Sequence, residues 1–496
     1  MKLYLKGHTE LYAVEQLQMQ LFPDEPTETV TAPFGCADGA VSALHEGEKW
    51  LTATAKITWR GRTARAVKRL EKSKAEDVRL RRRILQQSYF LAAVEVRGMT
   101  PPWGALAGVR PTKLSTQHIQ NGGTEASADR LLRDVYYVTE QRRKLCIDCS
   151  RHTLEAAGHL RPKDLSVYIG IPFCPTRCAY CSFVSQSIEK FGRYLEPYLD
   201  ALIKEIEYTG KLLKSSGWTI RSLYMGGGTP TTLNSAQMQR LMDAINANFD
   251  LSDCLEFTVE GGRPDTLDLE KLQVIRRGGA DRMSINPQTM SDEVLRRIGR
   301  SHTTAQLLQA YQDARAAGFE GINMDLIAGL PGDTVESFLD SVRQIIALEP
   351  SNITVHTLAL KKAAALYQQR PDLPSGEEVA EMLDRTEQAL RQAGYEPYYL
   401  YRQKYMSGSF ENVGWCKPGF TGLYNIYMME ELHTILSLGG GGMNKVNTGV
   451  NQLERFHNPK IPQDYIARID TILQQKDEIF DIMDNVQCAM DNGGIR

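Results

Sequence analysis

The chain has 496 residues, 42% of them hydrophobic and 24% charged, which predicts a globular protein of two or three domains. Its net charge of −2 gives no overall attraction to nucleic acid or anionic membranes and argues against nucleic acid as a partner. No apolar run approaches the ~18 residues that would span a bilayer, and the N-terminus lacks the apolar core of a signal peptide. Nine cysteines without a secretion signal indicate a reducing, cytoplasmic location.

Residues 1–160 have the mixed pattern of a separate α/β domain. Short apolar runs at Met1–Leu5 and Ala53–Trp59 predict strands, and the pattern of Lys68–Tyr89 predicts a helix. The interval 56–83 carries twelve Lys and Arg residues against three acidic ones. Two interpretations stay open: a solvated helix face, or a surface for an anionic ligand such as a multi-carboxylate tetrapyrrole or RNA.

From residue 161 to residue 356, strand-like and helix-like patterns alternate six times. This alternation predicts an α/β fold, a parallel sheet curled into a partial (β/α)6 barrel with its chemistry at the carboxyl ends of the strands. The strand candidates are Ser166–Ile169, Ile220–Met225, Leu255–Glu260, Arg282–Ile285, Gly321–Ile327 and Asn352–His356. Amphipathic stretches between them include Tyr194–Leu212, Ala236–Phe249 and Val335–Leu348.

Three cysteines, Cys174, Cys178 and Cys181, follow the first of these strands within eight residues. Pro172 and Pro175 force a loop there, because proline neither donates to a strand ladder nor continues a helix. Three thiolates on one short loop can hold three corners of an iron–sulfur cube and leave the fourth iron open for chemistry. The alternatives are buried structural cysteines, a disulfide with a spare thiol, and structural zinc, which normally takes four ligands.

Glycine and polar residues follow the later strands. The run 226–229, Gly-Gly-Gly-Thr, comes after the second strand; it can expose backbone N–H groups to a ligand, although a tight turn explains it equally well. Glu260 ends the third strand, where a buried carboxylate requires a cationic or hydroxyl partner, and an ion pair with Arg263 is the alternative. Three further polar residues lie at or after the fourth and fifth strands, and each alone could be structural: Gln288, Arg300 and Asp325.

Residues 357–496 predict a third, mostly helical domain. Periodicity predicts helices at Glu378–Ala393 and Tyr465–Gln475, and an aromatic run predicts a strand at Tyr395–Tyr401. The expected organisation is therefore an N-terminal α/β domain over 1–160, the partial barrel over 161–356 and this domain over 357–496.

The spacing Cys-x3-Cys-x2-Cys, with Tyr180 directly before the last cysteine, resembles the radical S-adenosylmethionine (SAM) superfamily. The wider string Tyr-x-x-Ile-Pro-Phe-Cys, which starts at Tyr168, resembles the oxygen-independent coproporphyrinogen III oxidase branch, which also includes heme chaperones. The resemblance implies a 4Fe–4S cluster on Cys174, Cys178 and Cys181. It also implies that SAM is bound by Tyr168, Tyr180, Gly226, Gly227, Gly228, Thr229, Glu260, Gln288, Arg300 and Asp325.

Two positions depart from the porphyrinogen-oxidising relatives. Those proteins often have a histidine where this chain has Gly170, and a further cysteine where it has Phe183. Heme chaperones lack that cysteine as well. The long first domain, with the stretch 106–113, resembles instead a longer subgroup of coproporphyrinogen dehydrogenases. The departures bear on the substrate and leave the cluster and SAM binding intact.

The resemblance implies an oxygen-independent coproporphyrinogen III dehydrogenase, a radical SAM oxidoreductase of heme biosynthesis. Such an enzyme converts two propionates into vinyl groups and yields protoporphyrinogen IX. Its partners would be the porphyrinogen substrate and an electron donor such as flavodoxin or ferredoxin. A heme chaperone that keeps cluster and SAM, and an RNA-modifying radical SAM enzyme that uses the basic run, remain alternatives.

Overall fold

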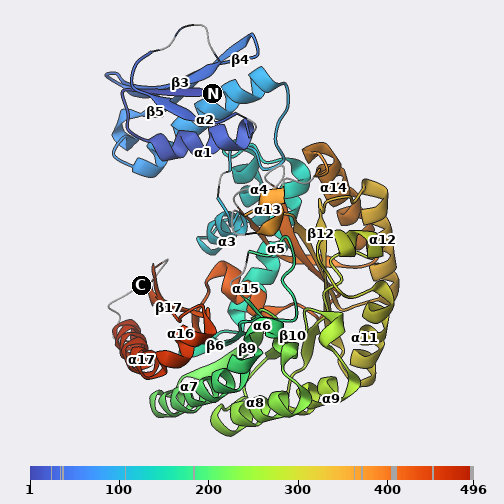
Figure 1. Ribbon diagram of the computed structural model, residues 1–496. Coiled ribbons are helices and arrows are strands. Elements are labelled where there is room, and N and C mark those ends of the chain that lie inside the picture. The colour runs from blue at the N-terminus through green and yellow to red at the C-terminus, as the bar shows by residue number, and fades with distance from the viewer. Residues whose placement is uncertain are drawn as a thin grey trace. The chain divides into compact units, whose positions relative to one another are not determined.

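The computed structural model describes residues 1–23, 25–33, 35, 38–106, 108–182, 185–361, 364–369, 372–403, 410–449 and 452–491 (Figure 1). Phe183, one of the two departures noted above, lies outside these described residues. Two compact units divide the chain: Met1–Ile147 together with Phe410 form the first, and the rest of the chain from Asp148 forms the second. Among the residues described, no helix is both long and apolar enough to cross a membrane.

A five-stranded sheet in the order β2-β1-β3-β4-β5 forms the centre of the first unit. Its strands are β1 (Lys2–Lys6), β2 (Glu28–Val30), β3 (Gly39–Glu46), β4 (Trp50–Trp59) and β5 (Arg62–Glu71). The helices of this part of the chain are α1 (Leu11–Leu21), α2 (Val78–Arg97), α3 (Thr112–Gln120), α4 (Glu125–Asp134) and α5 (Glu140–Gly158).

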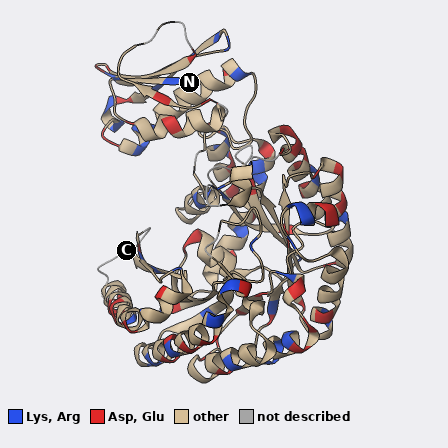
Figure 2. Cartoon of the chain, viewed as in Figure 1, with Lys and Arg blue, Asp and Glu red and all other residues tan. Residues whose placement is uncertain are grey.

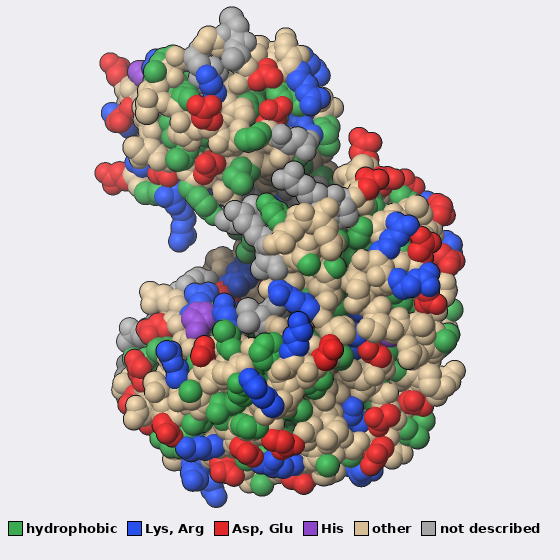
Figure 3. All heavy atoms as spheres, in the orientation of Figure 1, with side chains coloured by type: hydrophobic (Ala, Val, Ile, Leu, Met, Phe, Trp, Pro, Cys, Tyr) green, Lys and Arg blue, Asp and Glu red, His purple; other side chains and the backbone are tan. Residues whose placement is uncertain are grey.

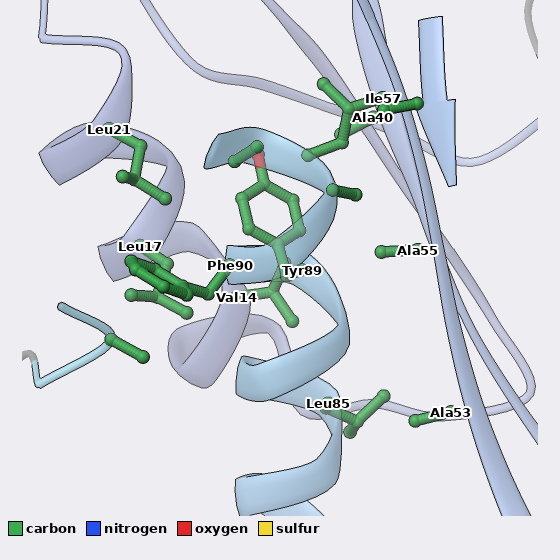
Figure 4. Packing of buried hydrophobic residues seen from close by; sticks show 14 of the residues in the cluster. Val14, Leu17, Leu21, Ala40, Ala53, Ala55, Ile57, Leu85, Tyr89 and Phe90 are labelled. Atoms are coloured by element: carbon green, nitrogen blue, oxygen red, sulfur yellow. The ribbon is translucent and has the colours of Figure 1, made fainter. Parts of the chain in front are cut away.

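Helices α1 and α2 cover one face of this sheet, and the alternation of side chains along the strands explains why. Ala55 and Ile57 of β4 point to the helices and join one core with Leu17 of α1 and Tyr89 of α2 (Figure 4). The hydroxyl of buried Tyr89 donates to Oε1 of Gln18 at 2.9 Å, which offsets the cost of burying it. The residues that alternate with this core face the solvent.

The helix predicted at Lys68–Tyr89 is wrong in its first part. Arg62–Glu71 forms the strand β5, which pairs antiparallel with β4 over the whole length of both strands. The helix begins only at Val78, where the side chain of Asp77 accepts hydrogen bonds from two backbone N–H groups of the first turn. Cross-strand pairing on a half-buried ladder therefore overrides the helix propensity of the Arg, Lys and Ala residues in this stretch.

An eleven-stranded sheet forms the second unit, in the order β14-β15-β13-β12-β11-β10-β9-β6-β16-β17-β18. Six neighbouring strands in it are parallel: β6 (Asp164–Ile171), β9 (Thr219–Gly227), β10 (Glu256–Glu260), β11 (Arg282–Ser284), β12 (Gly321–Ala328) and β13 (Asn352–Thr357). Figure 1 shows helices along the outside of these strands: α7 (Leu195–Ser216), α8 (Ser235–Asn248), α9 (Leu269–Arg277), α11 (Thr304–Ala316) and α12 (Val335–Leu348). All six strands predicted from the sequence are confirmed, and so is the α/β partial barrel.

The region after residue 356 extends this sheet at both edges. Strands β14 (Glu396–Arg402) and β15 (Glu411–Cys416) continue it beyond β13, and β16 (Thr434–Gly439), β17 (Met443–Gly449) and β18 (Gln452–His457) continue it beyond β6. The helices here are α13 (Ala365–Gln369), α14 (Gly376–Gln392), α15 (Leu423–Glu430), α16 (Pro462–Ala467) and α17 (Ile469–Asp491). Helices predominate, as predicted, but the sequence analysis missed all of these strands except β14. The domain limits at residues 160 and 356 stay predictions.

Short elements complete the chain. They are β7 (Phe173–Cys174), β8 (Gln186–Ser187), α6 (Ile188–Phe191), α10 (Asp292–Arg297) and the 3-10 turns Lys72–Lys74, Gly192–Tyr194, Pro230–Thr232 and Pro264–Thr266. The strand pair β7–β8 matters most for function, because it carries the first of the three clustered cysteines.

A buried ion pair ties α17 to α7 and the sheet. The side chains of Lys476 and Glu205 are 1% and 0% exposed, and Nζ lies 3.2 Å from Oε1. Nζ of Lys476 also donates to the carbonyl oxygen of Ser437, and the backbone N–H of Gly439 donates to Glu205 at 2.8 Å. Because both charges are removed from water, each depends on the other. In contrast to this buried pair, many other Lys, Arg, Asp and Glu residues lie along the helices on the outside of the sheet (Figure 2).

Candidate functional site

The carboxyl ends of the parallel strands surround a cavity of about 240 Å³. Its lining contains every residue predicted for the cluster and SAM except Tyr168 and Gly226. These lining residues are Cys174, Cys178, Cys181, Tyr180, Gly227, Gly228, Thr229, Glu260, Gln288, Arg300 and Asp325. The fold thus brings together side chains spread over about 150 residues, as expected where ligands bind outside the carboxyl ends of parallel strands.

The lining also contains polar residues that the sequence analysis did not select. They include Arg177, Arg263, Asn286, His356, Lys361, Tyr401 and Asn412. His356 lies at the end of the sixth predicted strand, so the strand-end rule applied to that strand would have found it. Tyr401 and Asn412 come from β14 and β15, and no local pattern reveals that these strands lie next to the barrel.

The cysteine loop is held by backbone hydrogen bonds from distant segments. The N–H of Ala179 donates to the carbonyl oxygen of Ile298 at 2.9 Å, and the N–H of Leu366 donates to that of Ala179 at 2.8 Å. Within the loop, the N–H of Cys181 donates to the carbonyl oxygen of Cys178 at 3.1 Å. The three cysteines are half-buried at the edge of the cavity.

Two buried arginines hold the same loop by side-chain contacts. Nη2 of Arg300 donates to the hydroxyl of Tyr180 at 3.0 Å, and Nη1 of Arg263 donates to Oγ1 of Thr176 at 2.9 Å. Arg263 forms its ion pair with Asp265, at 2.6 Å. Among the described residues it forms none with Glu260, so the structure does not contain the ion pair considered as the alternative for Glu260.

These residues fit a 4Fe–4S cluster. Thr229 donates from Oγ1 to Sγ of Cys174 at 3.6 Å, and a Cβ atom at Gly228 would lie 2.9 Å from the same sulfur, so the second strand end approaches the loop as closely as glycine allows. The described His, Cys, Asp and Glu side chains form no group of three that would hold a single metal ion. In a 4Fe–4S cluster the iron atoms lie at separate corners, so three thiolates along one loop can each bind a different iron. The cysteine loop supplies these three thiolates.

Glu260 lies over the glycine turn at the end of β9. A Cβ atom at Gly226 would be 2.7 Å from Oε2 of Glu260, and one at Gly227, whose φ is +119°, would be 2.9 Å from the backbone nitrogen of Ile171. Burial and the negative charge of Asp325 raise the pKa of Glu260 to about 7. A buried carboxyl group whose pKa is raised in this way fits a cationic ligand, such as the ammonium or sulfonium group of SAM.

Gln288 presents an unused hydrogen-bonding atom to the cavity. Its backbone N–H donates to the carbonyl oxygen of Asp325 at 2.8 Å, and its own carbonyl oxygen accepts from Ile327 at 2.9 Å. These bonds hold Gln288 at φ +67°, which is uncommon outside glycine. Oε1 of its buried side chain has no hydrogen-bond partner within the described part of the chain, and a ligand donor could supply one.

Tyr168 and Gly170 lie behind the cavity on β6. The ring of Tyr168 stacks on Tyr224 and Tyr424, with centroids 6.3 and 6.4 Å apart, and it does not line the cavity. A Cβ atom at Gly170 would lie 2.9 Å from the carbonyl oxygen of Gly440. The histidine of the porphyrinogen-oxidising relatives therefore has no room at this position.

Comparisons with known proteins agree with this geometry. The model of the radical SAM superfamily matches residues 168–345. The chain is 38% identical over 385 residues to the oxygen-independent coproporphyrinogen-III oxidase-like protein HemZ of Bacillus subtilis (strain 168), covering 76% of this chain and 77% of HemZ. It is 32% identical over 294 residues to the heme chaperone HemW of the same organism, covering 57% of this chain and 73% of HemW.

A solved structure extends the comparison to the fold. Coproporphyrinogen III oxidase (HemN) from Escherichia coli, described as a radical SAM enzyme, matches with a TM-score of 0.52 and 26% identity over 64% of this chain and 72% of HemN. Radical SAM proteins use a 4Fe–4S cluster and SAM, and these are the cofactors of this chain. The chain belongs to the radical SAM superfamily and, within it, to the family of oxygen-independent coproporphyrinogen III oxidase-like proteins.

Proposed function

We propose that this protein is an oxygen-independent coproporphyrinogen III dehydrogenase, which converts two propionates into vinyl groups by oxidative decarboxylation and gives protoporphyrinogen IX. Each propionate loses carbon dioxide, a hydrogen atom and an electron. One observation carries the proposal: the alignment with the HemZ protein is longer than the whole of Asp148–Arg496, so it extends into the first unit. The match to HemW is short enough to lie within the second unit alone.

The chain's own residues would bind and orient. Cys174, Cys178 and Cys181 would hold the cluster, while Glu260 and Asp325 would accept hydrogen bonds from the cationic and hydroxyl groups of SAM. The bound cluster and SAM would supply the one-electron chemistry that removes a hydrogen atom from a propionate side chain. The protein's contribution is a walled cavity that excludes water and oxygen from that step.

Cations near the cavity suit a substrate with several carboxylates. Lys361 and Arg177 line it and are more exposed than Arg300, whose Nη1 donates to the carbonyl oxygens of Gly262 and Asn286. Arg300 is thus engaged with the protein, so Lys361 is the better candidate for pairing with a propionate. Lys and Arg are interspersed with Asp and Glu on the face of the second unit in Figure 3, which supports recognition by a few local cations.

A heme chaperone is the second candidate. It is favoured by the match to HemW and by Gly170, where the porphyrinogen-oxidising relatives often have histidine. A chaperone would bind heme stably at about one per chain and would not need to turn over the porphyrinogen.

One anaerobic experiment separates these functions. The reconstituted protein is incubated with coproporphyrinogen III, SAM and dithionite, and vinyl products and carbon dioxide are measured over time. A dehydrogenase forms two molecules of carbon dioxide per protoporphyrinogen IX, and flavodoxin or ferredoxin can then be tested in place of dithionite. Stoichiometric heme binding without vinyl product would reject the dehydrogenase in favour of the chaperone. The Cys178→Ala variant serves as the cluster-free control.

A further inference from the structure

His356 completes a group of charges on the wall of the cavity. It lies at the carboxyl end of β13, next to β12, which carries Asp325. Nε2 of His356 is 3.5 Å from Oδ2 of Asp325, and the two side chains are 26% and 16% exposed, so both are open to the cavity. The side chain of Asn412 hydrogen-bonds to His356 as well. Asp325 is held from its other side by Nδ2 of Asn323, at 2.7 Å.

The group contains two carboxyl groups and the imidazole. Burial lowers the pKa of His356, but its hydrogen bond and its attraction to Asp325 outweigh this and raise the pKa above the ordinary value. The same contacts lower the pKa of Asp325 despite its burial. His356 also lowers the pKa of Glu260, against the larger effects of burial and of Asp325. The group thus combines an imidazole whose protonation is favoured, a carboxyl group whose ionisation is favoured, and Glu260, whose pKa lies at about 7.

We propose that His356 is a positioning residue for SAM: its positive charge holds the carboxylate of Asp325 in place and favours the ionised form of Glu260 before the positively charged SAM binds beside them. Without a cation between them, the two carboxylates would repel each other, and one would take up a proton. SAM carries a sulfonium and an ammonium group, so it can provide the positive charge once it is bound. The proposal rests on SAM as cofactor and not on the identity of the substrate.

A proton should leave the protein when SAM binds. A positive charge beside Glu260 favours its carboxylate, so binding releases a proton wherever Glu260 is partly protonated beforehand. The affinity for SAM therefore rises as the pH rises through about 7, where Glu260 of the free protein ionises, and levels off above that.

The other groups that face Glu260 do not titrate in this range. Burial raises the pKa values of the tyrosines around it, which stay neutral, and Arg300 stays charged. Among the described residues, the titratable and charged groups that interact electrostatically with Glu260 or with these tyrosines, together with the tyrosines themselves, are Tyr168, Tyr224, Tyr399, Tyr424, Glu256, Asp325, Arg300 and His356. The difference in this pH midpoint between the wild type and a variant therefore reports on Glu260 and His356, because the α-amino group of SAM, which titrates at about pH 8, is common to both measurements.

The test is calorimetry of SAM binding to the reconstituted, unreduced protein between pH 6 and 9, without substrate. His356→Gln keeps a hydrogen-bonding side chain and removes the charge. Its midpoint should rise by about one pH unit, which lowers the affinity at pH 7 by up to about fivefold. At pH 9 its affinity should approach that of the wild type, because Glu260 is then largely ionised in both proteins. His356→Arg, which keeps the charge, should return the midpoint toward the wild-type value.

His45→Gln is the matched control, because His45 is exposed on the sheet of the first unit and should leave both midpoint and affinity unchanged. An equal loss of affinity at every pH in His356→Gln, with an unmoved midpoint, would mean that His356 only supports the fold and would overturn the proposal. So would a His356→Arg variant with the midpoint of His356→Gln. Neither result depends on whether coproporphyrinogen is turned over.

Discussion

Charged side chains on β4 and β5 of the first unit face the solvent, whereas those at the strand ends of the second unit face a cavity. Lys56 and Arg65, a directly opposed pair on β4 and β5, are both exposed. Glu260, Asp325 and Arg300 are enclosed, and each contacts other polar groups of the site. In the described part of the first unit, helices α1 and α2 cover one face of the sheet, and the exposed face of β4 and β5 can carry charges at little cost. Inside the curled second sheet, a charge needs a partner or a ligand, and its presence there indicates function.

Loss of the cluster should have the largest effect. Cys178→Ala removes one of the three thiolates, and we expect it to abolish the iron–sulfur absorbance and SAM cleavage after anaerobic reconstitution, because three protein ligands leave none to spare. Cys254→Ala is the control, since that half-buried cysteine lies outside the cavity and its Sγ donates to the carbonyl oxygen of Glu256. A Cys178→Ala protein that keeps its iron and cleaves SAM would refute the assignment of the loop.

The ion pairs of the two units should differ by several-fold in their effect on stability. Lys476→Met strands Glu205 without its cation in a dry site, and we expect a loss of about 3–5 kcal/mol in the free energy of unfolding of the second unit. Lys72 pairs with Glu46 at 3.0 Å in the first unit, but both side chains are at least half-exposed, at 50% and 62%. Lys72→Met should therefore cost below about 1 kcal/mol. Denaturation in urea measures both, and equal losses would contradict the comparison.

Introducing the histidine of the porphyrinogen-oxidising relatives at position 170 should destabilise this protein. Gly170→His places a side chain against the backbone oxygen of Gly440, and we expect a loss of about 1–3 kcal/mol in the free energy of unfolding, without a gain in turnover. Gly158→His is the control, because a Cβ atom at that exposed position has no neighbour within 4 Å. A Gly170→His variant that is as stable as the wild type would mean that the loop at Gly440 yields easily, and a gain in turnover would give the missing histidine a catalytic role.

The smallest effect is expected for the exposed basic residues of β4 and β5. If only enclosed cations recognise the substrate, Lys56→Gln combined with Arg65→Gln should change the KM for coproporphyrinogen less than about twofold in 0.15 M salt, where exposed charges are screened. Lys361→Gln, at the cavity, should raise the KM several-fold with little change in kcat. If the Lys56→Gln, Arg65→Gln double variant changed the KM more than Lys361→Gln does, the basic interval 56–83 would instead be favoured as a binding surface for an anionic ligand.

Much of the second unit could be predicted, because strand and helix patterns alternate regularly and the rule for strand ends places Glu260, Gln288 and Asp325 at one edge. β5 was missed because its Arg, Lys and Ala residues favour a helix, and only pairing with β4 makes it a strand. Strand β16 was missed because it pairs with β6, far away in the sequence, and β17 and β18 continue the sheet from β16. The pairing of Glu205 with Lys476 joins residues 271 positions apart, which no local pattern encodes.

The support of the cysteine loop by late segments also has a consequence for biogenesis. The loop depends on the N–H of Leu366, and its parent strand β6 gains the neighbour β16 only when Thr434–Gly439 has been made. During synthesis on the ribosome, the thiols emerge long before the wall that encloses them. The loop therefore reaches its folded form only in a nearly finished polypeptide, and a nascent chain stalled before that point would display unprotected cysteines.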